Sequence, residues 1–248
     1  MIKTNKYDHI IADGFGTLFD HNLDPLPGAL MFIKNNKNLT LFSNIGSMTG
    51  DLLRSKLEKR FELLPKNIIT SLDLTIKKLK KLNLKEISHF GGINAQEALE
   101  SNFNLTCNYN AEALVMTSLP NQNYIESCQN ALNFFLNENK KIILANPDRI
   151  SPEPPFKITV AMFFDIFLNQ AEKIKKTVES MEIGKPILSL SDLHIDESSS
   201  ILVVGDNPDT DIELGNYLNC DSILISKNIH STPTPTFIVE GLDKIENS

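Results

Sequence analysis

The stretch from Tyr7 to Asp24 constrains the fold of this chain more than any other part of it. It opens with an apolar run at 9–12 (HIIA), which predicts a short buried strand that ends at Asp13. A glycine-bracketed turn follows at 14–17 (GFGT), where the backbone can take unusual angles and come close to a ligand. A carboxylate at the end of a buried strand is costly unless it has a partner or a function. Asp13 is therefore a candidate nucleophile or metal ligand, and equally a residue that ends the strand and caps the turn.

The next segment repeats the pattern of a strand followed by a helix. We expect helices at 29–35 and 48–61, and between them a buried strand at 39–42 (LTLF) that ends at Ser43 and Asn44. Strands that alternate with helices are typical of a parallel sheet covered by helices. The hydroxyl of Ser43 would then be well placed to bind a ligand oxygen. Its alternative role is to cap the next helix.

From about residue 69 the sequence pattern changes. About 110 residues, enough for a separate domain, alternate again between helices and strands. Its expected elements are helices at 72–82, 95–101, 124–136 and about 160–181, and strands at 87–90, 112–116 and 141–145. The last of these strands ends at Asn146 and Asp148, and a proline-rich loop follows at 151–155.

The last third returns through an Ile-Gly-Lys-Pro segment at 183–186. The most apolar strand of the chain is expected at 199–204, and it ends in the acidic segment 205–211 (GDNPDTD). A short helix at 212–218 and closing strands at 221–225 and 237–239 complete the pattern. Asp209 or Asp211 could simply begin a helix there.

Four polar elements therefore follow strands or loops: Asp13, Ser43, Lys185, and Asp206 with Asp211. Together they suit phosphoryl transfer through an aspartyl-phosphate. In that chemistry a carboxylate attacks phosphorus, and Mg²⁺, held by carboxylates and phosphate oxygens, offsets the repulsion between anions. A lysine and a hydroxyl bind the remaining phosphoryl oxygens.

Composition narrows the function classes. The chain has 248 residues and a formal net charge of −7, which argues against a nucleic-acid binder. Its three cysteines, Cys107, Cys128 and Cys220, show neither metal-ligand spacing nor a disulfide framework. No apolar run approaches the length of a membrane span, and no leader pattern opens the chain. We therefore expect a cytoplasmic protein without membrane or nucleic-acid partners.

The ordered motifs DGFGTLFDHN, LFSN, ANPD, IGKP and VVGDNPDTDIELG resemble the haloacid dehalogenase (HAD) superfamily, and most closely its class IIA, NagD-like and nitrophenylphosphatase-like branch. The resemblance covers essentially the whole chain. It implies a Rossmann-like α/β core with a parallel sheet, an inserted α/β cap domain, Mg²⁺ as cofactor and a small phosphorylated metabolite as substrate. It also allows a homodimer, because cap-mediated dimers occur in such families.

The resemblance assigns roles to individual residues. Asp13 matches the nucleophile, Ser43 the phosphate-binding hydroxyl, and Lys185 the lysine that steadies both the nucleophile and the phosphoryl group. Asp206 and Asp211 match the carboxylates of the metal site. The metal would also be bound by Asp13 and by the backbone carbonyl of Phe15. Asn44 and Asn207 would line the site, with Asn44 among the phosphate-binding residues.

The position of the insertion implies the domain boundaries. Asp13 and Ser43 are too close in sequence for a cap between them, so the insertion lies between Ser43 and Lys185. This predicts a core of residues 1–70 and 184–248 and a cap of residues 71–183. Within the cap, Asn146, Asp148 and the loop 151–155 are expected to face the substrate.

One departure from the family pattern affects catalysis. The family motif is usually DxDG, and here Phe15 replaces its second Asp, which protonates the leaving alcohol and then activates water. Loss of such help typically costs about 10²–10⁴ in rate. Asp20 or His21 could replace the acid, or the substrate could have a leaving group that needs no proton. Alternatively, the chain is a catalytically silent protein that binds a phosphorylated ligand.

Overall fold

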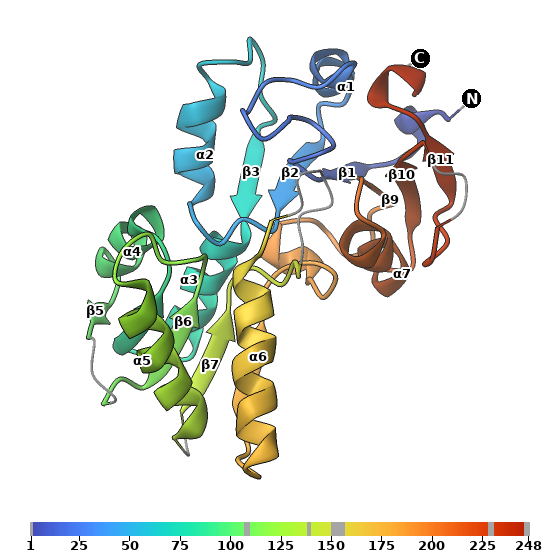
Figure 1. Ribbon diagram of the computed structural model, residues 1–248. Helices are drawn as coiled ribbons and strands as arrows, with labels where there is room; N and C mark the ends of the chain where they lie inside the picture. Colours follow the sequence, from blue (N-terminus) through green and yellow to red (C-terminus); the bar gives the residue numbers. More distant parts are fainter. Residues whose placement is uncertain (1, 107–109, 138–139, 150–156, 228–230, 246–248) are drawn as a thin grey trace. The chain divides into compact units, whose positions relative to one another are not determined.

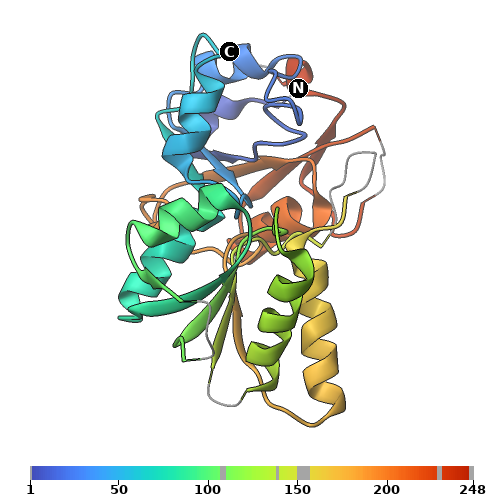
Figure 2. The ribbon, with the colours of Figure 1, turned by 60° about the vertical axis from the view of Figure 1, so that its left-hand side comes forward.

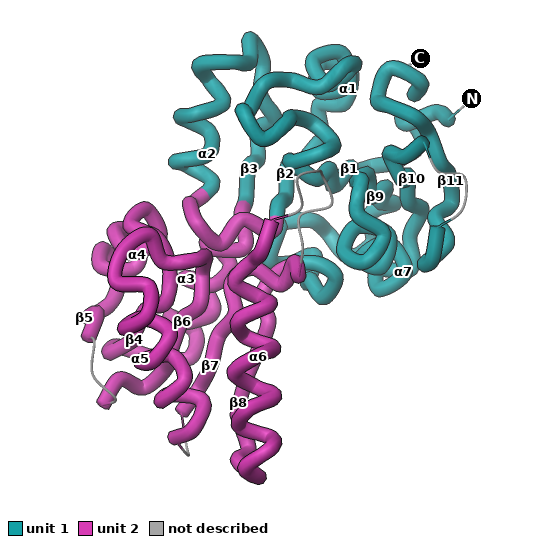
Figure 3. Tube along the Cα trace, viewed as in Figure 1, with its two compact units in different colours: residues 1–43, 50–69, 185–248 teal, residues 44–49, 70–184 magenta. Residues whose placement is uncertain are grey.

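The computed structural model describes residues 2–106, 110–137, 140–149, 157–227 and 231–245. Contacts divide the chain into two compact units (Figure 3). Unit 1 comprises residues 1–43, 50–69 and 185–248, and unit 2 comprises residues 44–49 and 70–184. The predicted cap loop 151–155 lies outside the described residues.

Unit 1 is built on a six-stranded sheet with the order β11-β10-β9-β1-β2-β3 (Figure 1). Its strands are β1 (His9–Ala12), β2 (Leu39–Ser43), β3 (Asn67–Thr70), β9 (Ile201–Gly205), β10 (Asp221–Ile225) and β11 (Phe237–Val239). The pairs β1–β2, β1–β9, β9–β10 and β10–β11 are all parallel. Every residue of β2 and β9 is buried, as expected for strands covered on both faces. The predicted α/β class with a parallel sheet is confirmed.

The helices of unit 1 are short. They are α1 (Ala29–Asn35), α2 (Gly50–Leu57), α7 (Glu213–Tyr217), the 3₁₀ turns Thr4–Lys6, Leu190–Asp192 and Leu242–Lys244, and a π-helical turn, Pro208–Ile212. Helix α2 is shorter than the predicted helix at 48–61, and the π-helical turn precedes the helix predicted at 212–218. This turn directly follows β9 and supplies Asp211 to the candidate site described below.

Unit 2 contains a second parallel sheet, with the order β5-β4-β6-β7-β8. Its strands are β4 (Glu86–Phe90), β5 (Asn104–Leu105), β6 (Ala113–Met116), β7 (Lys141–Leu144) and β8 (Glu179–Glu182). Its helices are α3 (Ser71–Lys81), α4 (Ile93–Glu100), α5 (Tyr124–Leu136) and α6 (Val160–Lys173).

Alternation along β6 explains the layers of unit 2. Leu114 and Met116 belong to a core cluster with residues of α5 and α6, whereas Ala113 and Val115 belong to a cluster with residues of α3 and α4. Because successive side chains of a strand point to opposite faces, the sheet is covered on both sides. Figures 1 and 2 show α5 and α6 side by side along one face of the sheet.

The helix predicted over 160–181 is wrong in its last part. Helix α6 ends at Lys173, Lys175 takes a positive φ of 61°, and residues 179–182 form β8 instead. This strand pairs with β7 in parallel, with Met181 opposite Ile143. The apolar residues at 174, 178 and 181 keep a helical spacing, so only the pairing with β7 reveals the strand. Strands β3 and β5 were likewise not predicted.

Within the described ranges, none of the helices has both the length and the apolar character needed to span a bilayer. This finding agrees with the absence of a long apolar run in the sequence.

Candidate functional site

Three of the predicted site residues lie at neighbouring strand ends in unit 1. Asp13 directly follows β1, and its backbone N–H donates to Val204 O at 2.9 Å, which fixes it beside the end of β9. Ser43 is the last residue of β2, and Asp206 directly follows β9. Since β1 lies between β9 and β2 in a parallel sheet, these residues share its carboxyl edge, where ligands of open α/β sheets bind.

Lys185 brings two of the carboxylates together. Its ammonium Nζ donates to Asp13 Oδ1 at 2.5 Å and to Asp211 Oδ1 at 2.6 Å. All three residues are buried, with 8% of Asp13, 2% of Lys185 and 1% of Asp211 exposed. A buried ammonium between two buried carboxylates forms short, charge-assisted hydrogen bonds. The arrangement therefore holds Asp13 in a fixed orientation.

Asp206 completes a cluster of acidic groups. Asp13, Asp206 and Asp211 each offer a carboxylate oxygen, and these oxygens lie within 4.8 Å of one another. Burial, together with repulsion from Asp13 and Asp211, raises the pKa of Asp206 well above its usual range. Burial also raises the pKa of Asp211, although the ammonium of Lys185 opposes that shift. The carboxylates thus outnumber the single ammonium in a space with little water.

Lys185 itself stays charged in this setting. Burial alone would lower its pKa, but the carboxylates of Asp13 and Asp211 outweigh that effect and raise it. The site therefore contains a permanent positive charge next to a candidate nucleophile.

The residues present fit a divalent cation. The donor set consists of carboxylate oxygens, which Mg²⁺ prefers, and the cluster has excess negative charge that a cation would neutralise. Asp13, Asp206 and Asp211 would supply the protein ligands or support them.

Two glycines make room for the carboxylates of the site. The sequence alone did not assign them this role. Gly16 has a φ of +75°, and a Cβ atom there would lie 2.2 Å from Asp206 Oδ2. A Cβ atom at Gly205 would lie 2.0 Å from Asp211 Cγ. The sequence signal for Gly16 is the glycine-bracketed turn at 14–17, and that for Gly205 is its position just before Asp206.

Asn207 orients Asp211 through its backbone. Its N–H donates to Asp211 Oδ2 at 3.0 Å, and its side chain accepts from Asp209 N at the start of the π-helical turn. With the bond from Lys185 to Oδ1, both oxygens of Asp211 are fixed. Asn207 thus contributes to the site by positioning a carboxylate.

Phe15 directs its ring toward its own loop. The ring packs edge-to-face on Phe19, with centroids 4.9 Å apart, and Phe19 is completely buried. The loop also closes on itself, because Gly14 O accepts from both Leu18 N and Phe19 N. The position two residues after Asp13 therefore carries an apolar ring that packs within its own loop.

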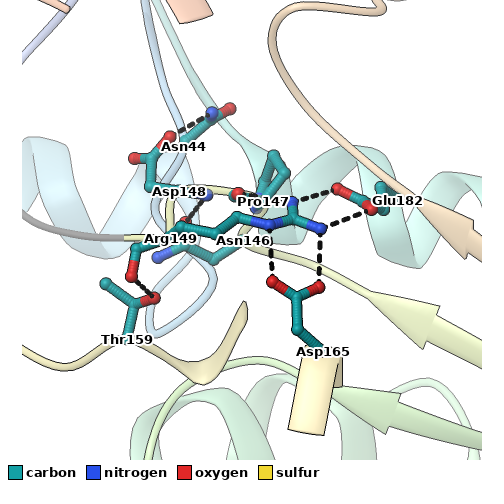
Figure 4. Close-up of polar contacts among 8 residues, drawn as sticks. All are labelled: Asn44, Asn146, Pro147, Asp148, Arg149, Thr159, Asp165 and Glu182. Carbon is teal, nitrogen blue, oxygen red and sulfur yellow. Dashed lines mark hydrogen bonds and ion pairs between the residues drawn. The ribbon is translucent and has the colours of Figure 1, made fainter. Parts of the chain in front are cut away.

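Asn44, which the sequence grouped with the phosphate-binding residues, belongs to unit 2. Its amide Nδ2 donates to Asp148 Oδ1 at 2.8 Å (Figure 4). Asn146 lies on the same loop and caps it by accepting from Asp148 N through Oδ1. These residues form a polar network within unit 2, whereas Asp13, Phe15, Ser43, Lys185, Asp206 and Asp211 lie in unit 1.

Comparisons with known proteins identify the fold. The HAD-hydrolase-like family model matches residues 182–245, the segment that contains Lys185, Asp206 and Asp211. A p-nitrophenyl phosphatase from Archaeoglobus fulgidus superposes with a TM-score of 0.79 at 19% identity, covering 95% of this chain and 97% of that one. The chain has a haloacid dehalogenase fold.

Other solved structures of this HAD fold give the same result. NagD from E. coli K-12 has a TM-score of 0.77 at 21% identity, covering 98% of this chain and 99% of that one. A 4-nitrophenylphosphatase from Thermotoga maritima has a TM-score of 0.78 at 19% identity, covering 96% and 95%. A search among curated proteins gave no significant match. The predicted resemblance to NagD-like and nitrophenylphosphatase-like proteins is confirmed at the level of the fold.

Proposed function

We propose that this HAD-fold chain is a Mg²⁺-dependent phosphatase-like hydrolase that acts on a small phosphorylated metabolite through an aspartyl-phosphate at Asp13. The observation that carries the proposal is the Lys185 ammonium, hydrogen-bonded to Asp13 and Asp211 beside the third carboxylate, Asp206. This gives a nucleophilic carboxylate a fixed direction and a cationic neighbour, which phosphoryl transfer to a carboxylate requires.

In the proposed reaction an oxygen of Asp13 attacks phosphorus, and the bond from phosphorus to the leaving oxygen breaks. Water then attacks the phosphorus of the aspartyl-phosphate, which releases inorganic phosphate and restores Asp13. Lys185 and the hydroxyl of Ser43 would hold phosphoryl oxygens during both steps. Mg²⁺, when bound, would supply electrostatic stabilisation of the phosphoryl group.

Unit 1 corresponds in this proposal to the HAD core and unit 2 to the cap. Segment 44–49, predicted to be part of the core, lies in unit 2: Ile45 O accepts from Leu72 N at 3.3 Å, and Met48 O accepts from Thr70 Oγ1 at 2.9 Å. The choice of substrate by the cap, a homodimer, the absence of nucleic-acid and membrane partners, and a cytoplasmic location stay predictions.

Phe15 should make the enzyme selective for good leaving groups. Its ring cannot protonate a leaving alcohol, and Asp20 is poorly suited to replace the missing acid. Asp20 Oδ1 accepts from Asn22 N at 2.8 Å and Asp24 N at 3.0 Å. The N–H groups of Asp24 and Asn22 lower the pKa of Asp20, so it stays ionised. Turnover of ordinary alkyl phosphates should therefore be slow.

The lack of an acid at Phe15 also supports the alternative, a protein that binds a phosphorylated ligand without turnover. The cluster of Asp13, Lys185, Asp206 and Asp211 can bind a metal and a phosphate whether or not an acid is present. What separates the two functions is the rate of the chemical step.

The test is an assay with Mg²⁺ and two substrates, p-nitrophenyl phosphate and an alkyl phosphate such as glycerol phosphate. We expect turnover of p-nitrophenyl phosphate, whose leaving group needs no proton, and far slower turnover of the alkyl phosphate. Phe15→Asp should raise the alkyl phosphate rate by about 10²–10⁴. Phe15→Leu, which adds no acid, is the matched control and should not raise it.

Asp13→Asn should abolish all turnover. Binding of Mg²⁺ and inorganic phosphate without any hydrolysis, in both the natural chain and Phe15→Asp, would favour the silent binding protein. Turnover that persists in Asp13→Asn would place the chemistry elsewhere.

A further inference from the structure

The polar network of unit 2 includes a residue that is next in the chain to a residue of the candidate site. Ser43 and Lys185 are the residues of unit 1 that directly precede and follow segments of unit 2. Their immediate neighbours in the chain, Asn44 and Gly184, both belong to unit 2. Whatever fixes Asn44 and Gly184 therefore limits, through one peptide bond, where Ser43 and Lys185 can lie.

Asn44 and Gly184 are packed against each other. A Cβ atom at Gly184 would lie 2.3 Å from Asn44 Oδ1 and 3.3 Å from Pro147 Cδ, and Gly184 has a φ of +132°. A side chain there would displace Asn44, which explains the glycine before Lys185. On its other side, Asn44 Nδ2 donates to Asp148 Oδ1 at 2.8 Å. The loop 145–149 thus contacts both neighbours of the proposed phosphate-binding residues.

Arg149 ties this loop to two elements of unit 2, as Figure 4 shows. It donates from Nε and Nη2 to Asp165 of α6, at 3.2 and 3.0 Å, and from Nη1 and Nη2 to Glu182 of β8, at 2.5 and 2.8 Å. Nη1 also donates to Pro147 O at 2.8 Å, and Arg149 O accepts from Thr159 Oγ1 at 2.7 Å. Two paired contacts to carboxylates fix both position and orientation.

Glu182 connects this anchor to the chain exit. It is the last residue of β8, two residues before Gly184 and three before Lys185. One short loop therefore contacts the residue after Ser43 through Asp148 and the strand that leads to Lys185 through Arg149. The side chains of the Arg149 ion pairs are 40–46% exposed, whereas the hydrogen bond from Asn44 to Asp148 is partly buried and joins residues 104 positions apart.

We propose that the loop 145–149 is a positioning clamp, in which Asp148 fixes Asn44 and Arg149 fixes the strand that leads to Gly184. The clamp thereby sets the spacing of their neighbours in the chain, Ser43 and Lys185. The inference rests on the proposed function, since it assigns these two side chains to the phosphoryl group. It also gives Asn44 a positioning role through its bond to Asp148.

The test exchanges the two partners of the central hydrogen bond. Asn44→Asp places two carboxylates opposite each other, and the double variant Asn44→Asp/Asp148→Asn restores a hydrogen bond with the donor reversed. We expect Asn44→Asp to lower kcat/KM for p-nitrophenyl phosphate by about tenfold to a hundredfold, as small misplacements of reacting groups do. The double variant should regain most of that loss. Inorganic phosphate should inhibit Asn44→Asp more weakly than it inhibits the natural chain.

Arg149→Met should have a similar effect and Arg149→Lys a smaller one, since lysine cannot make both paired contacts. Lys141→Met is the matched control, because Lys141 forms an ion pair with Glu179 at the opposite end of the same strands, β7 and β8. Breaking that pair should leave kcat/KM unchanged. If kcat/KM fell as much in Lys141→Met as in Arg149→Met, the network would contribute only to the stability of unit 2. That result would overturn the proposal.

Amide hydrogen exchange provides a readout that does not need activity. Segments 43–46 and 183–187 should exchange faster in Asn44→Asp and in Arg149→Met, and at the natural rate in the double variant. Unchanged exchange there, or a double variant as impaired as Asn44→Asp, would overturn the clamp. A natural chain that neither hydrolyses nor binds phosphate would instead overturn the proposed function, and the exchange rates would still decide the clamp.

Discussion

Lys185 Nζ lies 2.5 Å from Asp13 Oδ1, although 172 residues separate the two in the chain. The Lys185 side chain is 3% exposed and the Asp13 side chain 10% exposed, so their attraction is only weakly screened by solvent. Asp211, the second partner of Lys185, is buried as deeply. Removing the ammonium would leave carboxylates facing one another without compensation.

Lys185→Met should therefore destabilise the protein. The loss of one partner from a buried ion pair typically costs about 3–5 kcal/mol, because the remaining charge is uncompensated. Urea denaturation monitored by circular dichroism measures this loss. Lys6→Met, which removes an exposed pair with Asp221, is the control and should leave the midpoint unchanged. An unchanged midpoint in Lys185→Met would contradict the assigned electrostatics.

Mg²⁺ should stabilise the natural chain against unfolding. A ligand that binds only the folded state at a hundred times its dissociation constant adds about 2.7 kcal/mol. Asp206→Asn removes one of the three clustered carboxylates and should largely abolish the rise in melting temperature on adding Mg²⁺. Asp209→Asn alters an exposed carboxylate of the π-helical turn that contains Asp211, and this variant should keep the Mg²⁺-induced rise in melting temperature. Equal Mg²⁺ responses in these two variants would argue against the metal site.

Stability should also fall at acidic pH through His89 in unit 2. Burial lowers the pKa of His89 to about 4, and its Nε2 lies 2.8 Å from Thr117 Oγ1. The unfolded chain binds the proton near pH 6.5, so this contribution is intact above that pH and is lost as the pH falls from about 6.5 to 4. The loss amounts to about 3 kcal/mol.

The measurement compares the free energy of unfolding of the natural chain and His89→Gln at pH 7 and pH 4.5. The variant should show a smaller decrease between these values, because glutamine does not titrate. His194→Asn, at an exposed position, should follow the natural chain. A decrease in His89→Gln equal to that of the natural chain would remove His89 as the cause.

Strand ends were the part of the site that local sequence could predict. An apolar run that stops at an acid or a hydroxyl indicates a buried strand and its end, so Asp13, Ser43 and Asp206 could be located without coordinates. The sequence predicted a parallel sheet but no strand order; that β1 lies between β9 and β2 comes from the structure. The same local logic failed at 179–182, because a short, mostly polar strand carries no apolar signal of its own.

The sequence by itself determined which residues end the buried strands and that Phe15 carries no acid, since both follow from the order of residue types. Only the tertiary structure decided that Lys185 joins Asp13 to Asp211 and that the Phe15 ring packs on Phe19. It also decided that Asp148 holds the residue next to Ser43. The physical reason is that contacts between residues a hundred or more positions apart depend on how sheets and loops pack, and residue spacing does not encode that packing locally.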